Sequence, residues 1–352
     1  MIPHRTILNG LRSLNVGIAL CAFTLIRAGE APAGGNSGAE PLVRAVDSIG
    51  IPVTNITRSV DFYTRVLGFH QTLDRTVSGD AYEHLFGLYG MRLHMVRMQL
   101  GDESIELMQF LSPQGRPAPA DSGSNDRWFQ HIAIIVSDMQ RAYAVLRAND
   151  VTPASPEPQL LPAWNANAAG IAAYYFFDPD GNHLELLQFP PDKGAAKWHL
   201  RTKSLFLGID HTAIVVQNTA ASVAYYHDML GLDVAGHSDN YGPEQERLNN
   251  VFGAHLRITS LRAHSGPGIE LLEYVSPRTG RPYPSDTLAD DHWQWTVNLR
   301  TEPSIRLESV TALNDYTWIS NHPIELNDGS LGYRRAFMMR DPDGHATNLT
   351  LQ

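Results

Sequence analysis

The apolar residues of this chain fall into short strand-like runs, and each set of runs includes one amphipathic helix. The first run, residues 49–53, is followed by a segment in which Val60, Tyr63 and Leu67 recur on one helical face. A glycine then interrupts this spacing. The pattern therefore predicts a helix over residues 56–67.

The stretches after this helix have the character of strands. Residues 92–100 and 104–110 are separated by a Gly-Asp pair, which predicts a hairpin. The next part of the chain repeats the order, with a strand at 131–136, a helix at 139–148 and strands at 172–177 and 183–189. The order is β-α-β-β-β, it occurs four times along the chain, and it makes the expected fold class α+β.

Three pairs of similar segments indicate an internal duplication. The pairs are SVDFYTRVLGF (59–69) with SVAYYHDMLGL (222–232), LSPQGRPAPAD (111–121) with VSPRTGRPYPSD (275–286), and DPDGNHLELLQ (178–188) with DPDGHATNLTLQ (341–352). The pairs are collinear and almost equally spaced. The chain therefore contains two homologous halves, 45–190 and 205–352, joined by a linker over 191–204.

The first 33 residues resemble an export signal. Arg5 and Arg12 precede an apolar run over 14–26, and Ala-Pro-Ala at 31–33 offers a small-residue cleavage site. The run is too short to span a bilayer as a helix, so no membrane span is expected after cleavage. An uncleaved anchor and an ordinary helix are the alternatives. Residues 34–44 are then expected to be a flexible tether, and the mature protein to be periplasmic or extracellular.

Charge and composition exclude several classes of protein. The formal net charge of -10 and the lack of a basic run argue against a nucleic-acid partner. Hydrophobic residues make up 43% of the chain and charged residues 18%, which excludes disorder as its main state. The one cysteine, Cys21, lies in the expected signal, so the mature chain has neither a disulfide framework nor a thiolate metal cluster.

The motif FYxxxLGF in the first helix, and the DPDG turn that precedes a glutamate of the last strand, resemble those of the vicinal oxygen chelate superfamily. That superfamily includes glyoxalase I, extradiol dioxygenases and bleomycin resistance proteins. The resemblance covers residues 45–352 and implies four βαβββ modules paired into two half-open barrels. It also implies a divalent metal held by first-strand and last-strand side chains, a small-molecule substrate, and the option of a homodimer.

Carrying the family pattern over residue by residue gives a metal site in the N-terminal barrel. In the first module Ser48 departs from the pattern, whereas Glu106 matches it. In the second module His131 and Glu185 both match. The expected ligands are therefore Glu106, His131 and Glu185. One imidazole and two carboxylates suit Fe2+, Mn2+, Zn2+, Ni2+ or Co2+.

The C-terminal barrel matches the pattern less well. His211 and Glu270 match in the third module, but Trp295 and Asn348 stand at the corresponding positions of the fourth. Two ligands alone bind a metal weakly, so this barrel is expected to be degenerate and only a weaker candidate for a second metal site. Trp295 is expected to fill its cavity.

Three functions remain open from the sequence. The first is a metal-dependent, glyoxalase-like lyase or isomerase acting on a small molecule with vicinal oxygens, with Glu106 or Glu185 moving protons. The second is an Fe2+ extradiol-type dioxygenase. It is suggested by Tyr175, because the run Y-x2-DPDG-x3-E resembles the signature in which a tyrosine assists near the metal. The third is a metal-free binding protein of the resistance type, favoured by the departures at Ser48, Trp295 and Asn348.

Overall fold

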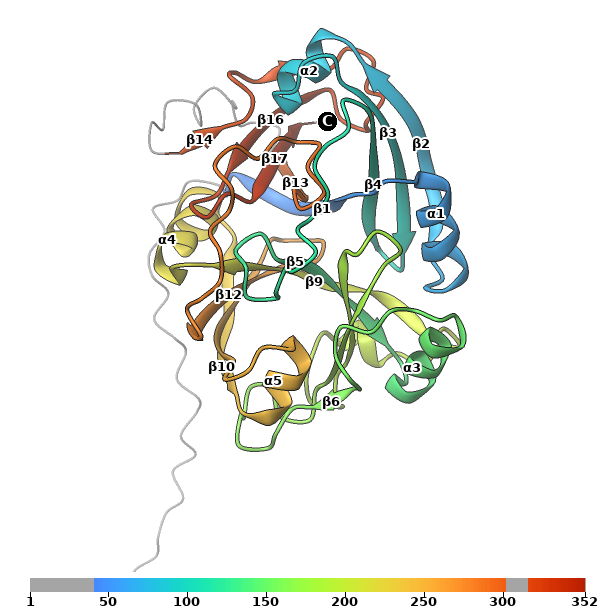
Figure 1. Ribbon diagram of the computed structural model, residues 1–352, viewed down its shortest axis with the longest axis vertical. Coiled ribbons are helices and arrows are strands. Elements are labelled where there is room, and N and C mark those ends of the chain that lie inside the picture. The colour runs from blue at the N-terminus through green and yellow to red at the C-terminus, as the bar shows by residue number, and fades with distance from the viewer. Residues whose placement is uncertain (1–40, 302–315, 352) are drawn as a thin grey trace, which may run out of the picture. The chain divides into compact units, whose positions relative to one another are not determined.

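The structure is a computed structural model that describes residues 41–301 and 316–351. The expected export signal, with Cys21, lies outside the described residues, and so does most of the expected tether. The chain divides into Met1–Glu40 and Pro41–Gln352, and the architecture below is that of the second unit (Figure 1). Its first strand already begins at Val43, so the last residues predicted as tether belong to a strand.

Four modules of the predicted type follow one another. The first contains β1 (Val43–Pro52), α1 (Ile56–Arg65), β2 (His70–Ser78), α2 (Asp80–Phe86), β3 (Arg92–Leu100) and β4 (Glu103–Ser112). The second contains β5 (Gln130–Val136), α3 (Met139–Ala148), β6 (Gln159–Leu160), β7 (Ala172–Phe177) and β8 (His183–Gln188), followed by the 3-10 turn η1 (Ala196–His199). The third contains β9 (Phe206–Val216), α4 (Thr219–Val223), the π-helical turn η2 (Ala224–Met229), β10 (Asp233–Tyr241), α5 (Pro243–Asn249), β11 (His255–Arg262) and β12 (Gly268–Ser276). The fourth contains β13 (Thr296–Thr301), β14 (Thr317–Trp318), β15 (Ile324–Glu325), β16 (Arg335–Arg340) and β17 (Ala346–Leu351).

The first helix shows how local sequence fixes these elements. The side chain of Asn55 accepts a hydrogen bond from the backbone N–H of Arg58 (3.0 Å) and caps α1. Phe62 and Tyr63 are buried against the sheet, as the predicted apolar face requires. Gly68 adopts a positive φ of 77° shortly after the end of the helix. The helix ends at Arg65, two residues before the predicted end at Leu67. The predicted α+β class is confirmed, and the first three modules have the predicted order. The segment between β13 and β14 of the fourth module, residues 302–315, lies outside the described residues.

The strands form two curled sheets. The nine-stranded sheet has the order β14-β16-β17-β13-β1-β4-β3-β2, with β15 paired to β16, and the eight-stranded sheet has the order β10-β11-β12-β9-β5-β8-β7-β6. Figure 1 shows that the two sheets occupy different parts of the unit. None of the helices among the described residues is both long and apolar enough to cross a membrane.

The modules pair differently from the expectation. β1 pairs antiparallel with β13, and β5 pairs antiparallel with β9. One sheet therefore combines the first and fourth modules, and the other combines the second and third. The prediction that modules one and two pair to form an N-terminal barrel is therefore wrong. Apolar periodicity identifies a strand but does not say which module lies next to it, because each opening strand is buried along most of its length.

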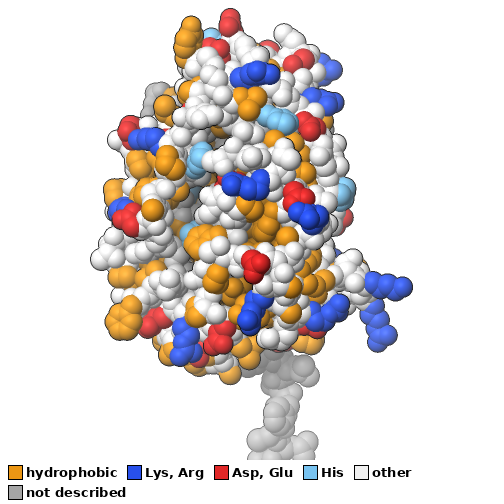
Figure 2. Space-filling view, turned by 45° about the vertical axis from the view of Figure 1, so that its right-hand side comes forward, with side chains coloured by type: hydrophobic (Ala, Val, Ile, Leu, Met, Phe, Trp, Pro, Cys, Tyr) orange, Lys and Arg blue, Asp and Glu red, His pale blue; other side chains and the backbone are white. Residues whose placement is uncertain are grey.

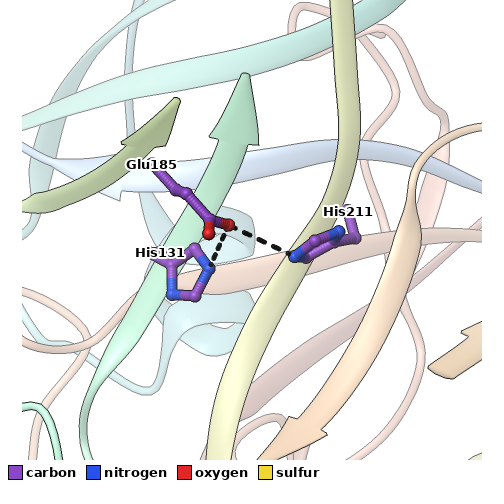
Figure 3. Close-up of side chains that lie close together, drawn as sticks. All are labelled: His131, Glu185 and His211. Carbon is purple, nitrogen blue, oxygen red and sulfur yellow. Dashed lines mark hydrogen bonds and ion pairs between the residues drawn. The ribbon is translucent and has the colours of Figure 1, made fainter. Parts of the chain in front are cut away.

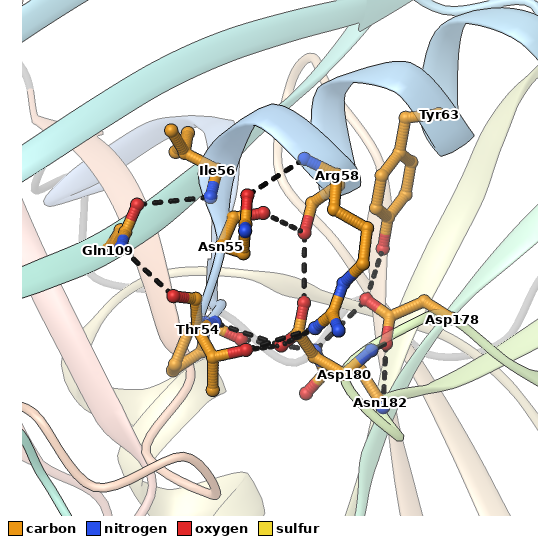
Figure 4. Close-up of polar contacts among 11 residues, drawn as sticks. Thr54, Asn55, Ile56, Arg58, Tyr63, Gln109, Asp178, Asp180 and Asn182 are labelled. Carbon is orange, nitrogen blue, oxygen red and sulfur yellow. Dashed lines mark hydrogen bonds and ion pairs between the residues drawn. The ribbon is translucent and has the colours of Figure 1, made fainter.

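The FYxxxLGF motif of the first module and the DPDG turn of the second module contact each other through hydrogen bonds (Figure 4). The hydroxyl of Tyr63, in the FYxxxLGF motif, donates to Asp178 of the DPDG turn (3.2 Å). Asp180 of the same turn accepts from the hydroxyl of Ser59 (2.8 Å) and from the guanidinium of Arg58 (2.6 Å). The second copy repeats the contact, because Tyr226 donates to Asp341 (3.1 Å). The motifs therefore connect consecutive modules whose strands belong to different sheets.

Two long arms cross between the modules. The first spans residues 113–129 and the second spans residues 277–295. Arg116 of the first arm donates to Asp291 of the second (2.6 Å), and Arg281 of the second donates to Asp126 of the first (2.6 Å). The arms approach so closely that a Cβ added to Gly115 would lie 1.9 Å from a backbone oxygen of the other arm.

Both kinds of charge are scattered over the surface. On the face in Figure 2, Lys and Arg side chains are interspersed with Asp and Glu side chains. That face therefore carries no basic patch of the size that a nucleic-acid backbone would need.

We expect Tyr63→Phe to lower the free energy of unfolding by about 1–2 kcal/mol, because the buried carboxylate of Asp178 loses a hydrogen-bond donor. Tyr226→Phe should cost a similar amount at the second copy. Denaturant unfolding measures both effects. Tyr89→Phe is the matched control, because Tyr89 is 92% exposed. A Tyr63→Phe protein as stable as this control would contradict the assigned role.

Candidate metal centre

Four neighbouring strands place side chains that could bind a metal ion on one inner face. Ala133 of β5 lies opposite both Glu185 of β8 and His211 of β9. His131, two residues earlier on β5, lies opposite Ala213. Because side chains alternate along a strand and paired residues share a face, all of these side chains point to the same side of the sheet. The alanines supply only a methyl group each and leave room for the larger side chains.

The polar groups on this face converge (Figure 3). Nε2 of His131 lies 3.2 Å from Oε2 of Glu185, and Nε2 of His211 lies 3.7 Å from the same oxygen. One ligand atom from each of these three residues lies within 4.8 Å of the others, and all three side chains are buried. Among the residues that the structure describes, this is the one group of three or more such side chains close enough to share a metal ion.

Glu270 extends the group from β12. It lies opposite Ala213 in the strand register, and its Oε2 lies 3.4 Å from Nε2 of His211. Its other oxygen accepts a hydrogen bond from Ser260 (2.7 Å). The side chain of Glu270 is 21% exposed and that of Glu185 is 6% exposed. Glu270 is therefore the carboxylate that a molecule entering from solvent reaches more easily.

A second layer of contacts orients His211. Its Nδ1 lies 3.0 Å from a carboxylate oxygen of Asp210, which holds Nδ1 as the donor and leaves Nε2 facing the two glutamates. Asp210 is itself fixed by Arg262 (2.7 Å) and by the indole N–H of Trp198 (3.0 Å). Nδ1 of His131, by contrast, is buried and has no hydrogen-bond partner among the described residues.

The carboxylates around His211 determine its protonation. Burial disfavours the charged imidazole, but the charge of Glu270 and the hydrogen bond to Asp210 outweigh burial and raise the pKa of His211 to about 9. At neutral pH the ring is therefore the doubly protonated, positively charged imidazolium. Its charge partly compensates the buried negative charge of the glutamates.

Tyr175 lies beside the group. It is the cross-strand neighbour of Glu185, and its ring lies 4.9 Å from that of His131. Burial raises the pKa of Tyr175 well above its usual range, and the charge of Glu185 adds to the effect. The hydroxyl is therefore a neutral proton donor at neutral pH.

The side chains of His131, Glu185, His211 and Glu270 line a cavity of about 780 Å³. Its wall includes the apolar side chains of Leu161, Ile171, Phe189, Trp198, Leu248 and Ile258, and polar side chains such as those of Asn240, Gln245 and Arg262 line it as well. A cavity of this volume in which polar groups converge is typical of a small-molecule site.

The structure separates the residues expected in the N-terminal metal site. His131 and Glu185 lie together as predicted, but Glu106 lies on β4 in the other sheet. His211 and Glu270, expected to form a weaker separate site, belong to the same group as His131 and Glu185. The expected ligand set failed because it assumed that modules one and two share a sheet.

The equivalent positions of the nine-stranded sheet hold a different network. Glu106 accepts hydrogen bonds from Ser48 (2.8 Å), Asn298 (3.0 Å) and Arg97 (3.2 Å). Burial raises the pKa of Glu106, and the positive charge of Arg97 opposes this rise. An internal guanidinium therefore provides a positive charge beside Glu106. This sheet is the degenerate one, and it comprises the first and fourth modules.

Trp295 does not stand at the first-strand ligand position that the family pattern assigned to it. Thr296 lies opposite Gly50 in the register, as His131 lies opposite Ala213, so Thr296 is the counterpart of His131. Trp295 lies one residue earlier, and its indole N–H donates to Asn182 (3.2 Å). A shift of one residue along a strand moves a side chain to the opposite face. Trp295 therefore does not occupy the ligand position.

The comparison with known proteins agrees with this fold. The model of the Glyoxalase/Bleomycin resistance protein/Dioxygenase superfamily matches residues 45–186 and 208–312. Glyoxalase I from Zea mays has a similar structure, with a TM-score of 0.56 and 16% identity over 88% of this chain and 92% of that chain. A putative dioxygenase from Bacillus subtilis subsp. subtilis str. 168 gives a TM-score of 0.55 and 15% identity over 88% and 86%. No curated protein matches the chain. The chain belongs to the Glyoxalase/Bleomycin resistance protein/Dioxygenase superfamily.

Proposed function

We propose that the protein is a metal-dependent, glyoxalase-like lyase or isomerase that acts on a small molecule with vicinal oxygens. The observation that carries the proposal is the convergence of His131, Glu185, His211 and Glu270 in one cavity. Four strands from two modules deliver these side chains to one place. A purely structural role would not need three buried ionisable groups and a partly exposed fourth so close together, because burying such groups without compensation is costly.

The donor set fits a divalent transition metal. Two imidazole nitrogens and two carboxylate oxygens suit Zn2+, Ni2+, Co2+, Mn2+ or Fe2+. Asp210 already fixes the Nδ1 tautomer of His211, as the outer contacts of metal-bound histidines usually do. The buried negative charge of Glu185 and Glu270 would be compensated by a cation, a task that the proton on His211 performs in part without one.

The surrounding residues define the chemistry. A divalent ion supplies Lewis-acid polarisation of two adjacent substrate oxygens. Glu270 is the better general base for the carbon-bound proton, since it is more exposed than Glu185 and Ser260 holds it in place. The neutral phenol of Tyr175 can donate a proton to a substrate oxygen. Apolar side chains such as those of Leu161, Phe189 and Leu248 offer contacts to the rest of the molecule.

A second candidate function has a specific observation in its favour. His131, His211 and Glu185 form a two-histidine, one-carboxylate group, the ligand set of many non-haem Fe2+ oxygenases. The sequence interpretation lacked this set because it assigned the two histidines to different barrels. Tyr175 beside this group also fits the extradiol dioxygenase alternative.

We expect the protein, purified without chelator or a nickel column, to contain about one divalent metal ion per chain. His131→Ala and His211→Ala should each lose it, because each removes one imidazole from the group. Elemental analysis measures the content. Glu106→Gln is the control and should retain the metal, since Glu106 lies in the other sheet. Loss of metal from Glu106→Gln alone would contradict the assigned centre, and no uptake by any sample would favour the binding-protein alternative.

Metal binding should weaken at low pH. The metal must displace the proton of His211, whose pKa is raised to about 9, so affinity should fall about tenfold for each pH unit below that value. Competition with a chromophoric chelator at pH 6, 7 and 8 measures the slope. Asp210→Asn removes one of the charges that raise this pKa and should flatten the dependence between pH 7 and 8. An affinity independent of pH would exclude His211 as a ligand.

The reaction class can be tested with simple probes. Metal-loaded protein should exchange the carbon-bound protons of dihydroxyacetone with solvent deuterium, as followed by proton NMR. Glu270→Gln, assayed at saturating metal, should slow the exchange by about 10²–10⁴-fold. Exchange that is equally fast in His131→Ala would contradict the proposal. Oxygen uptake with catechol by the Fe2+-loaded protein, without proton exchange, would instead support the dioxygenase alternative.

A further inference from the structure

A second cavity lies between the first arm and the DPDG turn of the second module. Its volume is about 620 Å³, and Ala118 lines it on the side of the arm. The rings that form its walls are those of Trp128, Phe129, Phe177, His183 and Trp295. None of these residues is among the four proposed metal ligands.

The indole N–H groups of this cavity are already satisfied. Trp128 donates to Ser122 (3.2 Å), and Trp295 donates to Asn182 (3.2 Å). The hydrogen-bonding capacity of the indoles is therefore used inside the protein, and what they offer to the cavity is ring surface. Trp293, which also lines the cavity, donates to Thr287 (3.0 Å).

The internal duplication supplies a second copy of this site for comparison. The two arms repeat each other closely, because Ser122 and Thr287 each accept from the indole of their own arm and each donate to a proline carbonyl three residues earlier. Arg116 and Arg281 also make matching ion pairs across the arms. The two arms can therefore be superposed residue by residue.

The arms differ at one decisive position. Where the first arm has Ala118 in the sequence Arg-Pro-Ala-Pro, the second has Tyr283 in Arg-Pro-Tyr-Pro. The phenol of Tyr283 packs against the second DPDG turn, with its ring 5.3 Å from that of His345. It lies so close to Gly344 that a Cβ added there would be 2.8 Å from the ring. Its hydroxyl donates to Gln294 (2.9 Å).

The residues around this arm position also differ between the two copies. Gln294 and Arg340, which surround the phenol of Tyr283 in the second copy, correspond to Phe129 and Phe177 in the first. His183 takes the place of the small Ala346. The first copy thus has no ring at the arm position, and aromatic side chains stand at these three wall positions. Its cavity lies beside Ala118, at the arm position from which Tyr283 packs against the DPDG turn in the second copy.

We propose that this cavity binds an uncharged, planar aromatic molecule, whose ring takes the place that the phenol of Tyr283 occupies in the second copy. In the second copy the same arm position holds a phenol, and rings packed at an angle or offset attract one another. The aromatic side chains of the first copy therefore offer ring surface to a benzene-sized molecule. An anion is disfavoured, because the acidic Asp180 lines the cavity and Arg58 is already paired with it.

An occupant of this cavity would lie one ring away from the proposed metal centre. The ring of Phe129 is 4.7 Å from that of His183 on the cavity wall and 5.4 Å from that of His131. The walls of this cavity consist of side chains other than the proposed ligands, so its occupancy does not require a bound metal.

The test uses p-cresol, which reproduces the side chain of tyrosine. Isothermal titration of the full chain, treated with chelator, should show saturable binding of about one p-cresol molecule. Ala118→Tyr should fill the cavity and weaken this binding at least tenfold, whereas Glu270→Gln, which alters only the other cavity, should leave it unchanged. Absence of saturable binding, or binding unaffected by Ala118→Tyr, would overturn the proposal, the latter because it would place p-cresol elsewhere.

The reciprocal variant makes the test independent of how Ala118→Tyr folds. Tyr283→Ala should empty the second copy and raise the binding from one to two p-cresol molecules per chain. Its melting temperature should rise with p-cresol concentration more steeply than that of the unaltered protein. A Tyr283→Ala protein that folds and binds no additional p-cresol would show that the arm position does not define an aromatic site, and the proposal would fail.

Discussion

The antiparallel pairing of β5 with β9 is the contact on which the rest of the site depends. In its register Ala133 lies opposite His211 and His131 lies opposite Ala213, so each histidine has an alanine as its direct neighbour. The parallel neighbours β8 and β12 then add Glu185 and Glu270 to the same face. A shift of one residue would turn the shifted strand's ligand to the other face of the sheet. The seam between two modules therefore creates a group that neither module contains.

The two sheets show how duplicated sites diverge. In one, two imidazoles and two carboxylates remain together with excess negative charge. In the other, Ser48 and Thr296 stand at the two imidazole positions, and Glu106 is bound by Arg97 and Asn298. The physical problem is the same in both cases, since a buried carboxylate needs a compensating positive group. In the nine-stranded sheet the guanidinium of Arg97 provides this positive charge. In the eight-stranded sheet the side chains are placed so that a bound cation can provide it.

The motifs that identify the family have a structural role here. Tyr63 and Asp178 bind each other, and so do Tyr226 and Asp341, at contacts that join consecutive modules. The arms add a second set of contacts through Arg116 and Arg281. These contacts connect modules whose strands lie in different sheets. The arms also differ between the copies, and a second cavity lies beside Ala118 of the first arm, where the second arm has Tyr283.

The sequence by itself determined the elements and the modules. Apolar spacing located α1 and α3, the DPDG turns located the last strands, and the repeat indicated four modules. The resemblance to the family then marked His131, Glu185, His211 and Glu270 as matching residues. The partner of each module was decided only in the tertiary structure, because periodicity describes the faces of a strand and not the strand beside it. For that reason Glu106 was placed with the wrong partners and Trp295 was assigned a position that Thr296 holds. Asp210, which precedes a matched histidine, was also missed, because its role depends on Arg262 and Trp198, which only the fold brings to it.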